Sequence, residues 1–188
     1  MIIPNSFQIN KNWWLQFPYP LRLITKIRFY SAFGAGGVIY LTSLIFNNIG
    51  LSATEIGLGF TISAIIGTVT RFLTGNYLNK TGKVQTPLII SSLLSIAASF
   101  CLIYSRDTFS YIIGQSLVGA AAGIYWPAAE FGVPYFCTPI DTRKAFALVR
   151  SSEALGMFLG VFLGGFMNNF LYTKSIFVND IFCMLVIN

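Results

Sequence analysis

Long uncharged stretches, separated by short polar segments, dominate the pattern of the chain. Charged residues are absent from residues 29–54, 84–105, 108–129 and 154–173. Each of these stretches exceeds the roughly 18 apolar residues that a helix needs to cross the hydrocarbon core of a bilayer. Lipid offers no partner to an unpaired backbone amide or carbonyl, so the spans must be helices. The pattern therefore predicts an all-α integral membrane protein, a polytopic bundle of about five to six transmembrane helices.

Cap and turn residues divide this bundle, and a Ser-x-x-Glu capping box at residues 52–55 opens the second helix. We expect transmembrane helices at residues 29–48, 56–78, 87–105, 109–131, 145–167 and 175–188. The last is expected to be incomplete, because at 1.5 Å per residue it reaches only ~21 Å against a core of ~30 Å. Residues 1–28 are expected to form a cytoplasmic or interfacial segment, and residues 29–188 the transmembrane bundle.

The basic residues indicate the orientation of the bundle. The N-terminal segment and alternate connections hold most of them: Lys11, Arg22, Lys26, Arg28, Lys80, Lys83, Arg143 and Lys144. The other connections hold Arg106 and Lys174. By the positive-inside rule, the first set and the N-terminus lie in the cytoplasm.

Composition excludes several classes of function. Of the 188 residues, 55% are hydrophobic and 10% charged, far fewer charges than the roughly 25% of a soluble domain. The net charge of +6 is spread over helix ends instead of forming one stripe, so we expect no nucleic-acid partner. The chain has no histidine, three isolated cysteines and no phosphate-binding glycine motif. We therefore expect no enzyme activity, no metal site and no cofactor.

Charged residues inside the expected helices are candidates for function, because an intramembrane charge is costly unless it is paired or hydrated. Arg71 is expected to extend to the inner surface or to form a structural pair, and the alternative is a role in gating or in substrate contact. Glu130 and Arg150 lie at equal distances from the turn between neighbouring antiparallel helices, which predicts an ion pair. Glu153, three residues after Arg150, is a candidate for proton coupling or one more member of the same charge cluster.

A central cavity for a small molecule needs hydrogen-bonding and aromatic groups among apolar ones. The candidates that line it are Tyr40, Asn47, Gln115, Tyr125 and Trp126. For each of them the alternative is packing between helices.

A short basic connection joins the second and third of the expected helices. It contains four residues with the spacing of the motif G-x-x-x-D-R/K-x-G-R/K-R/K, namely Gly75, Lys80, Gly82 and Lys83. In this respect the chain resembles the major facilitator superfamily, which has the motif between its second and third transmembrane helices. Asn79 replaces the Asp that is thought to lock the cytoplasmic gate, so the resemblance implies a weaker lock. Val84 departs from the last basic position.

Two further features carry the resemblance. The turn at residues 139–144, with Arg143, resembles the second basic turn of the family, and Gly156, Gly160 and Gly164 resemble its glycine-rich fifth helix. The gating motif is therefore expected to comprise Gly75, Asn79, Lys80, Gly82, Lys83 and Arg143, with Gly75 allowing close helix approach and Gly82 a tight turn.

The resemblance implies the N-terminal six-helix half of a secondary active transporter, which moves a small solute by alternating access. Proton coupling is possible, and the alternative is a non-transporting membrane scaffold or assembly factor, or an inactive truncated product. The expected partners are the lipid bilayer, a small-molecule substrate and a second six-helix half, either a missing C-terminal half or another copy. The glycine faces of helices 56–78 and 145–167 are expected to lack partners within the chain. We expect a multi-pass protein of the plasma (inner) membrane.

Overall fold

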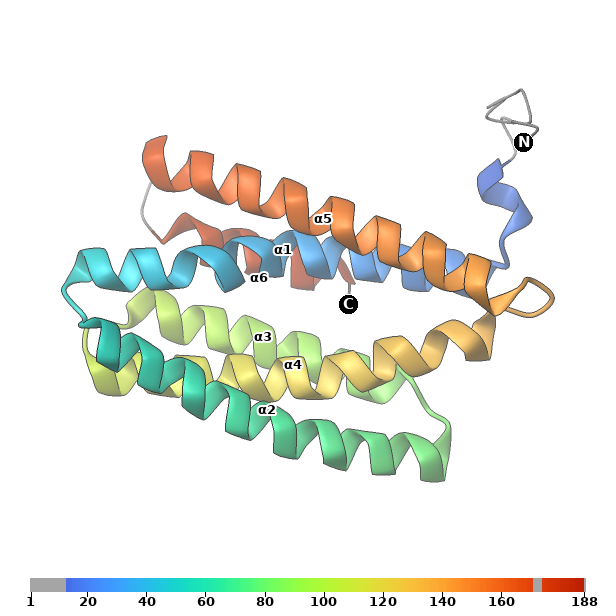
Figure 1. The fold of residues 1–188 in the computed structure, drawn as a ribbon, viewed down its shortest axis with the longest axis horizontal. Coiled ribbons are helices and arrows are strands. Elements are labelled where there is room, and N and C mark those ends of the chain that lie inside the picture. The colour runs from blue at the N-terminus through green and yellow to red at the C-terminus, as the bar shows by residue number, and fades with distance from the viewer. Residues whose placement is uncertain (1–12, 171–173, 188) are drawn as a thin grey trace, which may run out of the picture.

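The computed structural model describes residues 13–170 and 174–187, and in these ranges it contains helices and no strand. A short 3-10 helix, Trp13–Gln16, precedes six α-helices. These are α1 (Tyr19–Ile49), α2 (Ala53–Thr81), α3 (Gln85–Tyr104), α4 (Thr108–Phe136), α5 (Thr142–Phe170) and α6 (Ser175–Ile187). Figure 1 shows the start of α1, the α2–α3 connection and the α4–α5 connection at one end of the bundle. We call this the N-terminal end.

Four of the helices are long and apolar enough to cross a membrane, judged on length and composition over the residues that the structure describes. They cover Tyr19–Ile49, Ala53–Thr81, Gln85–Tyr104 and Thr142–Asn168. The fifth long helix, α4, packs against both α2 and α3, so much of its surface faces protein. At 1.5 Å per residue, the 31 residues of α1 extend over roughly 46 Å, which exceeds the hydrocarbon core of ~30 Å.

The N-terminal boundary differs from the expected one, because α1 begins at Tyr19 and not at residue 29. Pro20 lies in its first turn, where a missing amide hydrogen costs nothing. Leu21, Ile24 and Arg28 follow at helical spacing and are all buried. The expected start of the first helix at residue 29 is therefore wrong, and residues 1–12 lie outside the described ranges. Other boundaries also moved. The helix α4 continues through Pro134 to Phe136 instead of ending near residue 131, and α2 and α5 each extend three residues further at both ends than expected.

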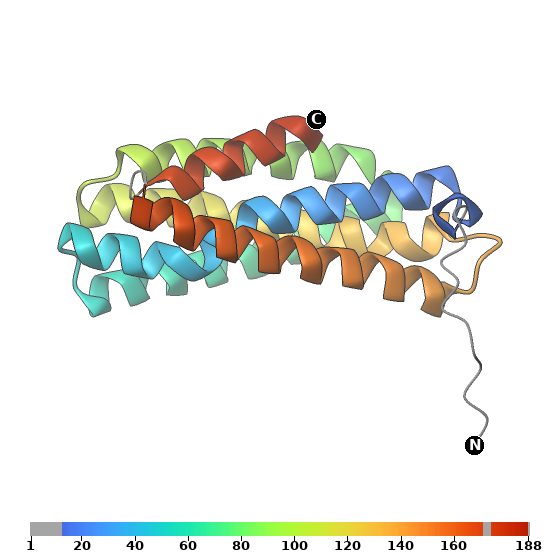
Figure 2. The same cartoon turned by 90° about the horizontal axis from the view of Figure 1, so that it is seen from above.

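The six helices form two layers. One contains α1, α5 and α6, the other α2, α3 and α4 (Figure 1). Within the layers, α1 packs against α5 and α6, and α4 packs against α2 and α3. Between the layers, α6 lies beside α3, as Figure 2 shows from above, and α1 meets α4.

Glycines bring the helix backbones together within each layer. A Cβ atom at Gly156 or Gly160 of α5 would overlap a backbone carbonyl oxygen of α1. A Cβ atom at Gly119 or Gly123 of α4 would overlap a carbonyl oxygen of α2 in the same way. The expectation that the glycine faces of α2 and α5 lack partners in the chain is therefore wrong. Small residues are the usual means by which membrane helices approach closely.

Polar caps organise the end of the bundle opposite the N-terminal end. The expected capping box is present, since Ser52 Oγ accepts from the Glu55 amide at 3.3 Å and the Ser52 amide donates to Glu55 Oε2 at 2.8 Å. The Thr108 hydroxyl at the start of α4 also donates to the Glu55 carboxylate. Lys174 donates to the carbonyl oxygens of Ile103 and Ser105, which lie at the end of α3.

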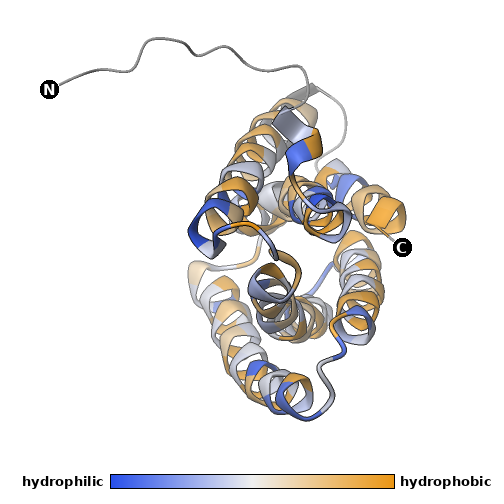
Figure 3. Ribbon diagram, turned by 90° about the vertical axis from the view of Figure 1, so that its right-hand side faces the viewer, coloured by the Kyte–Doolittle hydropathy of each residue, from blue (hydrophilic) through white to orange (hydrophobic). Residues whose placement is uncertain are grey.

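Large apolar side chains cover the outside of the bundle. On α2 and α5 many of them are exposed, among them Phe72, Leu73, Phe158, Phe162 and Phe166. Figure 3 shows hydrophobic positions on the outward sides of the helices as well as between them. This is the surface of a protein that has lipid or another apolar partner around it.

We predict that Gly160→Ala destabilises the bundle by about 1–3 kcal/mol, because its Cβ atom overlaps the Phe33 carbonyl of α1. The matched control is Gly165→Ala on the same helix, where no atom lies within 4 Å of an added Cβ. Thermal unfolding in detergent should show a lower midpoint for Gly160→Ala than for the wild type, and an unchanged midpoint for the control. Equal midpoints for the two variants would contradict the close α1–α5 packing.

Candidate functional site

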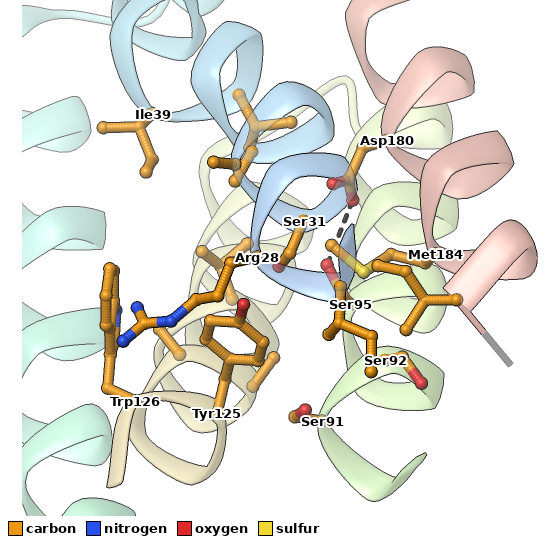
Figure 4. A pocket seen from close by; sticks show the side chains of 18 of the residues that line it. Arg28, Ser31, Ile39, Ser91, Ser92, Ser95, Tyr125, Trp126, Asp180 and Met184 are labelled. Carbon is orange, nitrogen blue, oxygen red and sulfur yellow. Dashed lines mark hydrogen bonds between the residues drawn. The ribbon is translucent and has the colours of Figure 1, made fainter. Parts of the chain in front are cut away.

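A cavity of about 110 Å³ lies in the interior of the bundle, between the two layers. Its lining comes from α1, α3, α4, α5 and α6. Most of the lining is apolar, contributed by small and medium side chains of α1 and α4 such as Ala35, Val38 and Ala121. Polar groups are gathered at two places, the Arg28 guanidinium with its neighbours and the Asp180 carboxylate with serines of α3 (Figure 4).

The first polar place is a cluster of four charged residues from three helices. Arg28 of α1 donates to Glu130 of α4 at 2.5 Å and to Glu153 of α5 at 3.0 Å. Arg150 of α5 lies 2.7 Å from Glu130 and 3.3 Å from Glu153. The two guanidinium groups and two carboxylates form a closed ring with no net charge. We refer to these four residues as the ion-pair cluster.

Aromatic rings support the cluster from α4. The Arg28 guanidinium lies 5.1 Å from the ring centre of Trp126 and 5.9 Å from that of Tyr125. Arg150 lies 6.0 Å from the Trp126 ring centre. Figure 4 shows the Arg28 guanidinium turned toward Trp126. Cation–π attraction therefore adds to the ion pairs in holding Arg28 between α1 and α4.

The cluster lies inside the bundle, near the N-terminal end. Arg28 is nine residues from the start of α1, a distance of roughly 14 Å along the helix. It is only 1% exposed, whereas the Arg150 side chain is 53% exposed. A buried charge without a partner costs several kcal/mol, so Arg28 depends on both carboxylates. The cluster thereby ties α1 to α4 and α5.

The structure brings together three of the four residues predicted for the charge cluster. The predicted Glu130–Arg150 ion pair is present, and Glu153 contacts the same Arg150. Arg71 is exposed on α2, and among the described residues no ion pair joins it to the other three. Arg71 therefore does not belong to the cluster, because the side of α2 on which it lies faces outward.

The predicted cavity residues divide into two groups. Tyr125 and Trp126 line the cavity. Gln115 is buried but lies outside the lining, and Tyr40 and Asn47 are exposed on α1. The prediction placed all five by residue type, whereas the helix face decides which side chains point inward.

The residues of the predicted gating motif lie at the N-terminal end, on the surface. Gly82 ends α2 in the left-handed conformation, with φ of 64°, and its amide donates to the Leu78 carbonyl at 2.8 Å, as expected for a tight turn. Asn79, Lys80 and Lys83 are exposed. Nothing lies within 4 Å of a Cβ atom added at Gly75, so its expected close helix approach does not occur within this chain.

Arg143, the last residue of the predicted motif, pairs with Asp141 in its own turn at 3.1 Å. Hydrogen bonds from Arg143 lower the pKa of Asp141. Both side chains are exposed, so this pair contributes little to stability.

Two functional candidates were missed in the sequence. Arg28 was assigned to the flanking segment, although Leu21, Ile24 and Arg28 have the spacing of one buried helix face. Asp180 was overlooked, although it is the one charged residue between residues 175 and 188. The rule that an intramembrane charge is a candidate by default could have found it.

The long apolar helices, the apolar exterior and the enclosed polar groups define a multi-pass helical membrane protein. The family model described as Major Facilitator Superfamily matches residues 27–187, and the chain belongs to this family. The six helices correspond to one of the family's six-helix units. A comparison with curated proteins gave no match to the chain.

We predict that Arg28→Gln costs about 3–5 kcal/mol, because it leaves two carboxylates to share Arg150. The double variant Arg28→Gln/Glu153→Gln should recover part of this loss, because it restores a neutral cluster. Arg71→Gln is the control and should change stability by less than about 0.5 kcal/mol. Thermal unfolding in detergent measures all three. A double variant that is no more stable than Arg28→Gln alone would show that the charges are not coupled.

Proposed function

We propose that the chain works in secondary active transport, moving a small solute across the membrane by alternating access. The observation that carries the proposal is the cavity between the two layers, with polar groups set in an apolar lining. Such a composition is typical of small-molecule sites. Membership of a transporter family agrees with it, and with a function other than catalysis.

Within this proposal the ion-pair cluster closes one end of the solute pathway. Arg28 and Glu153 both line the cavity and also belong to the cluster. A solute that moves either side chain therefore also changes the ion pairs of the cluster. When the cluster is closed, Glu153 is engaged by two guanidinium groups, from Arg28 and Arg150. Proton coupling, which we include as part of the proposal, would then require Glu153 to lose the Arg28 contact before it takes up a proton.

A second six-helix unit is the further partner in this proposal, covering α2 and α5. Their outward faces carry exposed phenylalanines, and nothing lies within 4 Å of a Cβ added at Gly57, Gly75 or Gly165. The motif residues Gly75 and Asn79 are one helical turn apart and face the same open side. In this proposal the motif, which also includes Lys80, Gly82, Lys83 and Arg143, has its gating role at the contact between α2 and the second unit.

The predicted orientation, with the N-terminal end in the cytoplasm of a plasma-membrane protein, is supported by the basic residues at that end.

Tracer uptake into sealed vesicles that contain the purified chain tests the transport proposal, with a panel of small cationic, neutral and anionic solutes. Ala122→Leu, which fills the cavity, should reduce uptake of any transported solute. Ala97→Leu, exposed on α3 and outside the cavity lining, is the matched control and should leave uptake unchanged. If proton coupling operates, a proton gradient stimulates uptake in the wild type and has less effect in Glu153→Gln. A folded chain that moves no solute would contradict transport and favour a non-transporting membrane scaffold.

Association of the chain tests the partner proposal. We predict that Gly75→Phe weakens the association of the chain with a second six-helix unit, while its unfolding midpoint is unchanged, because no atom of the same chain lies within 4 Å of a Cβ added at Gly75. Cross-linking in vesicles, with another copy present, measures this association. Leu93→Phe, exposed on α3, is the control. No cross-linked species in the wild type, or equal cross-linking in Gly75→Phe, would contradict an α2 interface between copies.

A further inference from the structure

Asp180 of α6 is a buried carboxylate that the ion-pair cluster does not use. It is 2% exposed and lines the cavity. Its Oδ2 atom accepts hydrogen bonds from Ser95 at 3.0 Å and from Ser99 at 2.7 Å, both on α3. Its Oδ1 atom has no hydrogen-bond partner among the described residues. One oxygen is therefore fixed by the protein, and the other is buried against Gly34 without a hydrogen-bond partner.

The surroundings of Asp180 are built to hold a carboxylate. A Cβ atom added at Gly34 of α1 would lie 2.8 Å from Oδ1, so the glycine makes room for this oxygen. Three helices thus meet at the group: α6 supplies the carboxylate, α3 the two hydroxyls and α1 the space. Ser95 lies ten residues into the 20-residue helix α3, near the middle of the bilayer if α3 spans it.

The charges that line the cavity do not cancel. The cluster contains two arginines and two glutamates and is neutral, and its guanidinium groups are paired with its own carboxylates. Figure 4 shows the Arg28 guanidinium turned away from Asp180. No salt bridge to Asp180 occurs in residues 13–170 and 174–187. An ionised Asp180 gives the cavity one uncompensated negative charge, which is costly at this depth.

We propose that this cavity binds a small organic cation with a single positive charge, such as a primary alkylammonium group, and that Asp180 Oδ1 is its counter-ion. This inference rests on the proposed function, because the same cavity is the solute site. On binding, the Asp180 side chain turns Oδ1 from Gly34 toward the ammonium group, which donates to it, while Val38, Val118 and Ala122 offer apolar contact to a short alkyl chain. The volume of about 110 Å³ suits a small ligand.

A bare metal cation fits the site less well. Ser91 and Ser92, also in the lining, donate to carbonyl oxygens of their own helix, and Ser95 and Ser99 donate to Asp180. Most of the lining is apolar and supplies no oxygen ligand. Among the described residues, no three Cys, Asp or Glu side chains form a group that could hold a metal ion.

Binding to the purified chain in lipid nanodiscs tests the assignment, by calorimetric titration with ethylammonium chloride. Sodium chloride at the same ionic strength and ethanol, a neutral molecule of similar size, are the comparison ligands. We expect ethylammonium alone to bind, and Asp180→Asn to weaken its binding by about 10-fold or more, because a charge-assisted hydrogen bond is lost. Asp141→Asn, in the exposed turn, should bind as the wild type does.

A second measurement uses the unchanged chain, in case Asp180→Asn does not fold. Dicyclohexylcarbodiimide, an apolar reagent, modifies carboxyl groups inside membranes, and peptide mass spectrometry locates the modification. Ethylammonium should slow the modification of Asp180, and sodium should not. Equal protection by sodium, no protection by ethylammonium, or unchanged affinity in Asp180→Asn would each overturn the assignment.

These outcomes are separate from those of the transport assay. Binding of ethylammonium at Asp180 without transport of any solute would support the cation site and contradict the proposed function. Transport of a neutral or anionic solute without binding of ethylammonium would support the function and contradict the cation site.

Discussion

The pairing of the Arg28 guanidinium with carboxylates from two other helices is the interaction on which the interior of this bundle depends. Arg28 is almost completely buried, and it bonds to Glu130 of α4 and Glu153 of α5. Without these partners, α1 could not place a charged residue so far from the start of the helix. The position of α1 between α4 and α5, and with it one wall of the cavity, follows from this pairing.

The contacts that hold the helices within each layer differ in kind from the contacts that join the two layers. Within a layer, glycines let backbones touch, as where Gly160 of α5 meets α1 and Gly119 of α4 meets α2. Between the layers, polar links occur at three heights: Arg28 to Glu130, Asp180 to the serines of α3, and Lys174 to the end of α3. Apolar contact also joins the layers at the end opposite the N-terminal end, where the tilted rings of Phe46 and Tyr111 have centres 4.5 Å apart.

Uncharged length was enough to predict the helical bundle from the sequence, and counting from the α4–α5 turn was enough to predict the contact between Glu130 and Arg150. Helix starts were harder to predict, because Pro18 and Pro20 indicate a break as readily as a beginning. The partners of glycine faces could not be predicted, because periodicity gives the direction of a face and not the helix that meets it. The same limit explains why Tyr40 and Asn47 were assigned to a cavity that they do not line. Asp180 could have been found by applying the rule for intramembrane charges to the last segment.

The sequence separation of the ion-pair cluster has a consequence for how the protein is made. Glu130 and Glu153 follow Arg28 by 102 and 125 residues, and the ribosome delivers the chain from its N-terminus. While α1 enters the bilayer, neither counter-charge has been synthesised. The nascent first helix therefore has to hold its arginine at the lipid headgroups or inside the insertion machinery, and it reaches its final depth only when the fourth and fifth helices arrive.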